Sequence, residues 1–302
     1  MTEATQTSQN PLGHDVPVIP RNIDFGLDDV DYNWHGKGPG VSNLMNALSL
    51  LFPEGEEFFV DSARNFVNEI EDPELKKEVR GFMTQEMIHT REHVAYNDML
   101  KRSGIDTDKL EAQLKRDLDR GRKMLPKKYQ LAITVFLEHW TASLAQMLLE
   151  HPETIENSHP KMQALWSWHA VEETEHKAVC FDLLRAVEPN DRKFYWLRIR
   201  PNIIGVLPFL GWIAYFYIQC MRQTGHAWDF KEHFKTIKFM WFTPGLFGRM
   251  IPMWADFFRK DFHPWDHDNR DQIAKWDAET ENDTKAIPPR FGVEAATPAA
   301  AA

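Results

Sequence analysis

Glutamate and histidine recur at the same short spacing in two places along the chain. Glu86 and His89 form one Glu-x-x-His motif, and Glu173 and His176 form another. Residues three apart lie on one face of a helix, so each motif would present a carboxylate and an imidazole together. One such motif is a common accident on a helix. Two of them in one chain predict a site for divalent transition metals, which bind carboxylate and imidazole ligands.

Two further acids interrupt stretches that are otherwise apolar. Glu56 is in phase with Phe52 and Phe59, and Glu138 is the single acid of residues 131–149. An unpaired ionised carboxylate in a core costs several kcal/mol, so four converging carboxylates require cations among them. Two Glu-x-x-His helices and two helices with one Glu each are the ligand pattern of dinuclear metal bundles. Four carboxylates balance two divalent ions, and the mixed oxygen and nitrogen ligands favour iron, with manganese as the alternative.

Several neighbours compete with these ligands. Glu54 and Glu57 compete with Glu56, and Glu172 and Glu175 compete with Glu173; we prefer the acids in phase with the apolar stripe. His93, one turn beyond His89, is interpreted as a support for a ligand or as a core histidine rather than as a ligand. Three other side chains could orient ligands or simply pack: Gln85, Trp168 and Asp182.

Helix signals place these residues on four long helices. Pro53 opens the first, Asp72-Pro73 the second, Pro126 the third and Pro160 the fourth, which is expected to run to about Val187. Residues 106–124 read as a solvated connector helix, and no hairpin signal is visible, so the fold class is all-α. The expected organisation is an extended arm over 1–40, a helical bundle over 41–189, an apolar helical annex over 190–262, and a polar helix with a disordered tail over 263–302.

Composition narrows the class of protein. The chain has 302 residues, a net charge of −10 and 43% hydrophobic residues, which fits a globular protein and argues against nucleic acid as a partner. Two isolated cysteines, Cys180 and Cys220, exclude a disulfide framework and a zinc-thiolate site. The N-terminus shows no secretory signal, so the expected location is the cytoplasm.

The annex contains the most apolar part of the chain. Residues 201–221 carry no charge and are long enough to span a membrane, but Gly205, Pro208 and Gly211 are expected to kink that segment. Either it associates with a membrane on the cytoplasmic side, or it packs with the aromatic run at 236–258, on the bundle or across a homodimer interface. Five aromatic residues could line the entry to a lipophilic pocket, although each could equally be ordinary core: Trp212, Tyr215, Phe216, Trp241 and Phe242.

The quoted motifs resemble a known family. FPEGEEFF at 52–59, QEMIHTREH at 85–93, Glu138 and WSWHAVEETEHKAVCFDLL at 166–184 are similar to the bacterial predicted metal-dependent hydrolases. That resemblance covers about residues 50–260 and implies a ferritin-like four-helix bundle with a dinuclear metal site. The spacing His169-x-x-x-Glu173-x-x-His176 is also similar to that of the di-iron arylamine N-oxygenases, in which the additional histidine is a ligand. Together these resemblances imply the metal ligands Glu56, Glu86, His89, Glu138, His169, Glu173 and His176.

A buried dinuclear site among apolar walls suits dioxygen activation better than hydrolysis, which needs an open, hydrated site. Our leading hypothesis from sequence is therefore a di-iron, O₂-dependent oxidoreductase of the hydroxylase, desaturase or N-oxygenase type. Its expected partners are a lipophilic small-molecule substrate and an external electron donor, and no catalytic residue is expected beyond the ligands. A metal-dependent hydrolase is the alternative, and a non-catalytic iron or O₂ binder is the third hypothesis.

Overall fold

The computed structural model describes residues 16–283, and within that range the fold is all-α, as predicted. The helices are α1 (Pro39–Ser49), α2 (Phe52–Arg64), α3 (Pro73–Arg102), α4 (Thr107–Met124), α5 (Lys127–Glu150), α6 (Pro160–His176), α7 (Val179–Val187), α8 (Asp191–Gln223), α9 (Phe230–Trp241), α10 (Leu246–Asp256) and α11 (Arg270–Asp283). Short 3₁₀ turns cover Leu27–Asp29, Pro152–Thr154 and Pro264–Asp266.

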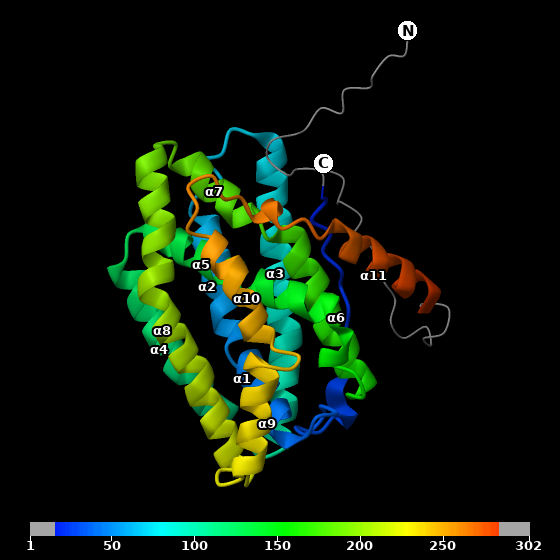
Figure 1. Ribbon diagram of the computed structural model, residues 1–302. Helices are drawn as coiled ribbons and strands as arrows, with labels where there is room; N and C mark the ends of the chain where they lie inside the picture. The colour runs from blue at the N-terminus through cyan, green and yellow to red at the C-terminus, as the bar shows by residue number, and fades with distance from the viewer. Residues whose placement is uncertain (1–15, 284–302) are drawn as a thin grey trace, which may run out of the picture.

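The predicted ligands lie on a bundle of α2, α3, α5 and α6. Helix α2 packs on α3 and α5, and α6 packs on α5 and α3, so the four helices surround one interior (Figure 1). The start of α3 follows the predicted signal, because the Asp72 carboxylate accepts hydrogen bonds from the backbone N–H groups of Glu74 and Leu75, and Pro73 is the first helical residue. A helical bundle is thus confirmed.

The fourth predicted helix, residues 160–187, is interrupted. It ends at His176 and resumes as α7 at Val179, with Lys177 and Ala178 in a turn between them. No glycine or proline marks this break, which is why helix signals in the sequence did not predict it. The Lys177 ammonium donates to the His267 carbonyl and the Asn269 side chain, both at 2.6 Å, so the turn is tied to the C-terminal segment.

The N-terminal segment crosses the outside of the bundle before α1 begins at Pro39 (Figure 1). Residues 19–25 run beside α3 and α6: the backbone N–H groups of Ile19 and Arg21 donate to Glu175 and Glu172, and that of Phe25 donates to Glu92. At the other end of the chain, α11 lies within the range 263–302, for which a polar helix and a tail are expected, and it contacts α6. Residues 1–15 of the predicted arm and the predicted tail at 284–302 lie outside the described range.

Helices α8, α9 and α10 cover one side of the bundle. Helix α8 packs on α1 and α5, and α10 packs on α5 and α9. Pro201 and Pro208 lie inside α8, and the helix is continuous through Gly205, Pro208 and Gly211, the residues that are expected to kink it. It is the single helix within residues 16–283 that is long and apolar enough to cross a membrane, and 17% of its most apolar window is buried.

Candidate metal centre

The seven ligands implied by sequence converge in the interior of the bundle. Helix α2 contributes Glu56, α3 contributes Glu86 and His89, α5 contributes Glu138, and α6 contributes the remaining three, His169, Glu173 and His176. All are buried, with at most 4% of any of them exposed. The alternatives Glu54 and Glu57 instead contact Lys115 on α4, and Glu57 is 53% exposed.

Three groups within this cluster could each hold an ion, because their ligand atoms lie within 4.8 Å of one another. The groups are Glu56–His89–His169, Glu86–His89–Glu173 and Glu86–Glu138–His176. Every one of the seven residues belongs to a group, and His89 and Glu86 each belong to two. The shared members join the groups into one elongated polar centre.

Each of the seven side chains presents a nitrogen or oxygen atom that has no hydrogen-bond partner. On the histidines these atoms are His89 Nδ1, His169 Nε2 and His176 Nε2, and on the acids they include both oxygens of Glu86 and of Glu138. The His176 Nε2 atom lies 3.2 Å from Glu86 Oε1 and 3.4 Å from Glu138 Oε2, at angles that make no hydrogen bond. Buried polar atoms without partners are costly, so their convergence fits a site that holds metal ions.

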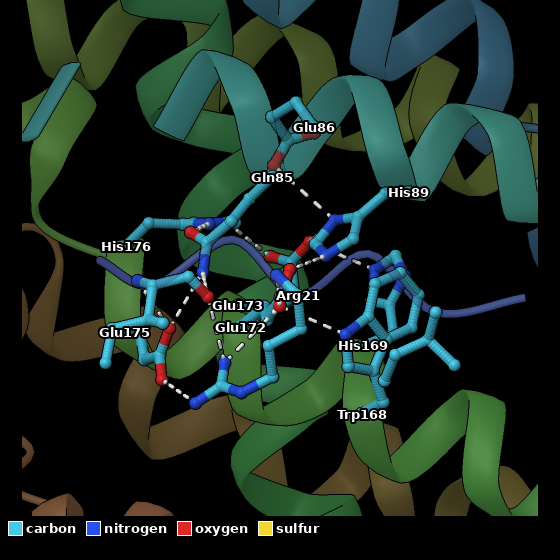
Figure 2. A network of polar contacts seen from close by, with 12 residues as sticks. Arg21, Gln85, Glu86, His89, Trp168, His169, Glu172, Glu173, Glu175 and His176 are labelled. Carbon is cyan, nitrogen blue, oxygen red and sulfur yellow. Dashed lines mark hydrogen bonds and ion pairs between the residues drawn. The ribbon is translucent and has the colours of Figure 1, made fainter. Parts of the chain in front are cut away.

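The opposite nitrogen of each histidine is hydrogen-bonded outward, as Figure 2 shows for His89 and His176. His89 Nε2 donates to Glu172 at 3.0 Å, which leaves the Nδ1 lone pair for the cluster. His176 Nδ1 donates to the Gln85 carbonyl oxygen at 2.9 Å, because the Gln85 amide nitrogen donates to Glu175 at 2.8 Å. Outward hydrogen bonds of this kind fix the tautomer and the ring orientation of metal-binding histidines.

The tautomer of His169 follows from a longer chain of hydrogen bonds. The Asn97 amide nitrogen donates to Glu111 at 2.8 Å, so its oxygen accepts from Ser49 Oγ at 2.8 Å. Ser49 Oγ then accepts from His93 Nδ1 at 3.0 Å, and His93 Nε2 accepts from His169 Nδ1 at 3.0 Å. His169 Nε2 therefore presents a lone pair to the cluster. His93 hydrogen-bonds His169 and belongs to none of the three ligand groups.

Arg21 pairs with buried acids beside the cluster, a role that the sequence did not predict. Its guanidinium donates to Glu175 at 2.6 Å and lies 3.3 Å from Glu172, and all three side chains are buried (Figure 2). Glu172 and Glu175, the two competitors of Glu173, are thus paired outside the cluster. Trp168 Nε1 donates to Glu172 as well, whereas Asp182 contacts His263. No local spacing could place Arg21 here, because more than 150 residues separate it from Glu172 and Glu175.

Burial dominates the electrostatics of the cluster. It raises the pKa of Glu56, Glu86 and Glu138 well above the usual value, and it lowers the pKa of His89 well below its own. Burial would also raise the pKa of Glu173, but the contacts with His169 and His176 outweigh it and hold that pKa well below the usual value. Cations at the centre would favour the ionised form of all four acids.

An apolar pocket of about 460 Å³ adjoins the cluster. It lies among α2, α4, α5, α8 and α10, and Glu56 and Phe52 form part of its wall. Of the five aromatic residues expected at a lipophilic entry, Trp212 lines this pocket. Phe216 is fully buried, the Tyr215 hydroxyl donates to Gln113, and the remaining two, Trp241 and Phe242, line a separate surface hollow.

Comparison with known proteins supplies one match. Residues 19–268 match the model of a family described as predicted metal-dependent hydrolase. No curated protein and no solved structure matches the chain. The ferritin-like relationship and the similarity to N-oxygenases therefore stay predictions.

Proposed function

The chain belongs to the family of predicted metal-dependent hydrolases, and from this membership we propose that it is an enzyme whose buried centre binds two metal ions and acts on an apolar small molecule. The observation that carries the proposal is the unpartnered atom on every one of the seven clustered side chains. A core that kept four glutamates there without cations would lose several kcal/mol for each.

Two ions fit the charge and the donors of the centre. Four carboxylates neutralise two divalent cations, and the three histidines are neutral ligands held by outward hydrogen bonds. Oxygen and imidazole donors without thiolate favour iron or manganese. When bound, such ions can polarise a substrate oxygen and activate water, or activate dioxygen if they are redox-active.

The pocket indicates the substrate class. Its wall is formed mainly by leucine, isoleucine, phenylalanine and tryptophan side chains, and Glu56 is the one proposed ligand that lines it. A molecule held there would make apolar contacts along its length and approach the centre at Glu56. The proposed substrate is therefore a lipophilic small molecule with its reacting group at the Glu56 end.

Hydrolysis is the reaction class favoured by the family description. In this reading, the residues of the chain would hold the ions and place the apolar part of an ester or amide in the pocket, with its carbonyl at the Glu56 end, close to the ions. Thr141 borders both the pocket and the small hollow beside His169 and Glu173, so it lies on the path between substrate and centre.

Oxidation with dioxygen is a second candidate because the centre is closed to water. The seven proposed ligands are at most 4% exposed, and Phe52 stacks on the His169 ring at 4.9 Å between pocket and centre. Such enclosure excludes water from oxidising chemistry. This reaction would require an external two-electron donor, as the sequence hypothesis stated, and the family description does not support it.

One set of assays separates these reactions. Metal analysis of the purified protein is expected to give two ions per chain, and fewer than one would overturn the proposed centre. Protein loaded with zinc or iron is then tested without oxygen for cleavage of esters with acyl chains of increasing length. Iron-loaded protein with a reductant is tested for consumption of O₂ that depends on an added apolar substrate. Anaerobic turnover with zinc establishes hydrolysis, whereas substrate-dependent O₂ consumption with incorporation of labelled oxygen establishes oxidation.

A further inference from the structure

Exposed apolar side chains concentrate on α8 and α9. Along α8, Ile203, Ile204 and Leu207 are 55%, 65% and 75% exposed, at helical spacing. Along α9, Phe230 and Phe234 are 73% and 69% exposed. Ile237 and Trp241 continue the α9 stripe one and two turns further on, with 48% and 42% exposure. Soluble surfaces rarely carry contiguous apolar patches of this kind without a partner.

These two stripes belong to one side of the molecule. Helix α8 and the α9–α10 pair run antiparallel beside each other (Figure 1). At one end the Tyr217 hydroxyl and His233 Nδ1 are 2.9 Å apart, and at the other Trp254 Nε1 donates to Asn202 at 2.9 Å. We call the exposed surface formed by α8 and α9 the α8–α9 face.

The charge around this face is positive although the chain as a whole has a net charge of −10. Acids within residues 192–251 are limited to Asp229 and Glu232, and Glu232 is buried and contacts Lys235. The exposed bases of the same range are Arg192, Lys193, Arg200, Arg222, Lys231, Lys235, Lys238 and Arg249. Exposed aromatic side chains interleaved with lysines are typical of helices that lie in the headgroup region of an anionic bilayer.

Polar contacts on the inner side of α8 argue against a simple membrane span. Buried Arg198 donates to the Arg259 carbonyl at 2.6 Å, the Tyr215 hydroxyl donates to Gln113 on α4 at 2.8 Å, and Asn43 on α1 donates to Thr224 just past the helix at 2.9 Å. The helix is thus tied to the bundle along its length. A helix that crossed the bilayer would have to break these contacts.

We propose that the α8–α9 face docks on an anionic lipid bilayer, with both helices lying in the plane of the interface. A second copy of the chain fits the face less well, because two basic surfaces would repel each other. Ile204 and Pro208 are exposed on α8 and also line the apolar pocket, so the pocket borders the docked face. If the proposed function holds, a lipophilic substrate can enter the pocket directly from the bilayer.

Flotation with lipid vesicles tests this docking. The full chain, loaded with metal, is mixed with vesicles of phosphatidylcholine alone or with a quarter of phosphatidylglycerol. We expect binding to the anionic vesicles, weakened by salt, and a loss of partitioning of about tenfold or more for Phe230→Ser/Phe234→Ser and for Lys231→Glu/Lys238→Glu. Matched controls lie on α3, outside the α8–α9 face: Met87→Ser, where Met87 is 53% exposed, and Lys77→Glu are expected to bind like the wild type.

Three results would overturn the docking. The wild type could fail to bind anionic vesicles. It could resist extraction from them by alkaline carbonate, which would mean a span. Sedimentation equilibrium could show a dimer that the phenylalanine variants convert to a monomer, which would mean that a second copy covers the face. Because vesicle binding needs neither turnover nor substrate, docking and the proposed reaction can fail independently.

Discussion

The four buried glutamates of the centre differ in the contacts that other side chains make with their carboxylate oxygens. One oxygen of Glu56 accepts a hydrogen bond from Thr90 at 2.9 Å, and Glu173 lies 3.0 Å from His169. Glu86 and Glu138 have no hydrogen bond at either oxygen. Glu138 also stands alone on its helix, without a histidine one turn away. Because its carboxylate makes no hydrogen bond, a substitution of Glu138 tests metal binding without removing another contact.

Replacing Glu138 by Ala is expected to lower the metal content from two ions per chain to one or none. The change removes two unpartnered oxygens and breaks no hydrogen bond of the side chain. Elemental analysis of the purified variant measures the effect. Glu57→Gln is the control, because Glu57 is 53% exposed and pairs with Lys115, and its metal content is expected to stay at two. Unchanged content in Glu138→Ala would mean that α5 supplies no ligand.

At the scale of the element, the helical periodicity of the sequence predicted which side of each helix is buried. It did not predict contacts between segments that are far apart in the sequence. Glu56 and Glu138 could be assigned because each lies within a helix whose apolar stripe shows which side is inside. The choice of Glu173 over Glu172 followed from the same phase. The apolar stripe of this helix does not show that Glu172 is equally buried. Glu172 is paired with Arg21, which comes from a segment without helical periodicity and therefore could not be predicted as its partner. The turn after His176 was missed for a related reason: tertiary contacts of Lys177 accompany it, and no local breaker marks it.

The N-terminal segment is expected to contribute to stability mainly through Arg21. Replacing Arg21 by Met leaves Glu172 and Glu175 buried without their cation, which costs about 3 kcal/mol or more. Urea unfolding measures the loss. Arg102→Met is the control. It removes a hydrogen bond from Arg102 to the Leu27 carbonyl at 3.0 Å, but Arg102 is 49% exposed, so the loss is expected to cost less than about 1 kcal/mol. Equal losses in both variants would contradict the role assigned to Arg21.

Helix α2 offers a way to fill the pocket without disturbing its walls. A Cβ at Gly55 would meet no atom within 4 Å, and Gly55 lines the pocket next to Glu56. Gly55→Leu is expected to gain about 0.5–1 kcal/mol from helix propensity and to weaken binding of an apolar fluorescent probe about tenfold. Gly211→Leu is the matched control, because a Cβ there also meets nothing within 4 Å and Gly211 is not part of the pocket wall. Probe binding unchanged in Gly55→Leu would mean that the probe binds elsewhere.

At the scale of the whole molecule, the bundle carries the cluster of proposed ligands, and the remaining helices and the N-terminal segment cover it. Helices α8 and α10 close the pocket over α2 and α5, and the N-terminal segment closes the opposite side through Arg21. The sequence leaves the two apolar runs to a membrane, to packing with each other on the bundle, or to a homodimer interface. In the structure α8 packs on α1 and α5, α10 packs on α5 and α9, and the outer side of α8 is exposed.

Acid is expected to destabilise the metal-free protein, in part through His35. This histidine is 3% exposed, its Nδ1 accepts a hydrogen bond from the Lys37 backbone, and burial lowers its pKa to about 4 from 6.5. Below pH 6.5 the unfolded chain therefore binds a proton that the folded protein excludes, so the free energy of unfolding falls with pH until about pH 4. The full effect of this one group is about 3 kcal/mol.

The variant His35→Phe removes this titration and keeps an aromatic ring against Phe239, whose ring lies 5.6 Å from that of His35. Urea unfolding of chelator-treated wild type and variant, at pH 7 and at pH 4.5, isolates the contribution, because metal release cannot then add to the pH dependence. The wild type is expected to lose more stability between these pH values than the variant, by about 2–3 kcal/mol. Parallel losses in the two proteins would show that His35 takes up its proton as readily in the folded state as in the unfolded chain.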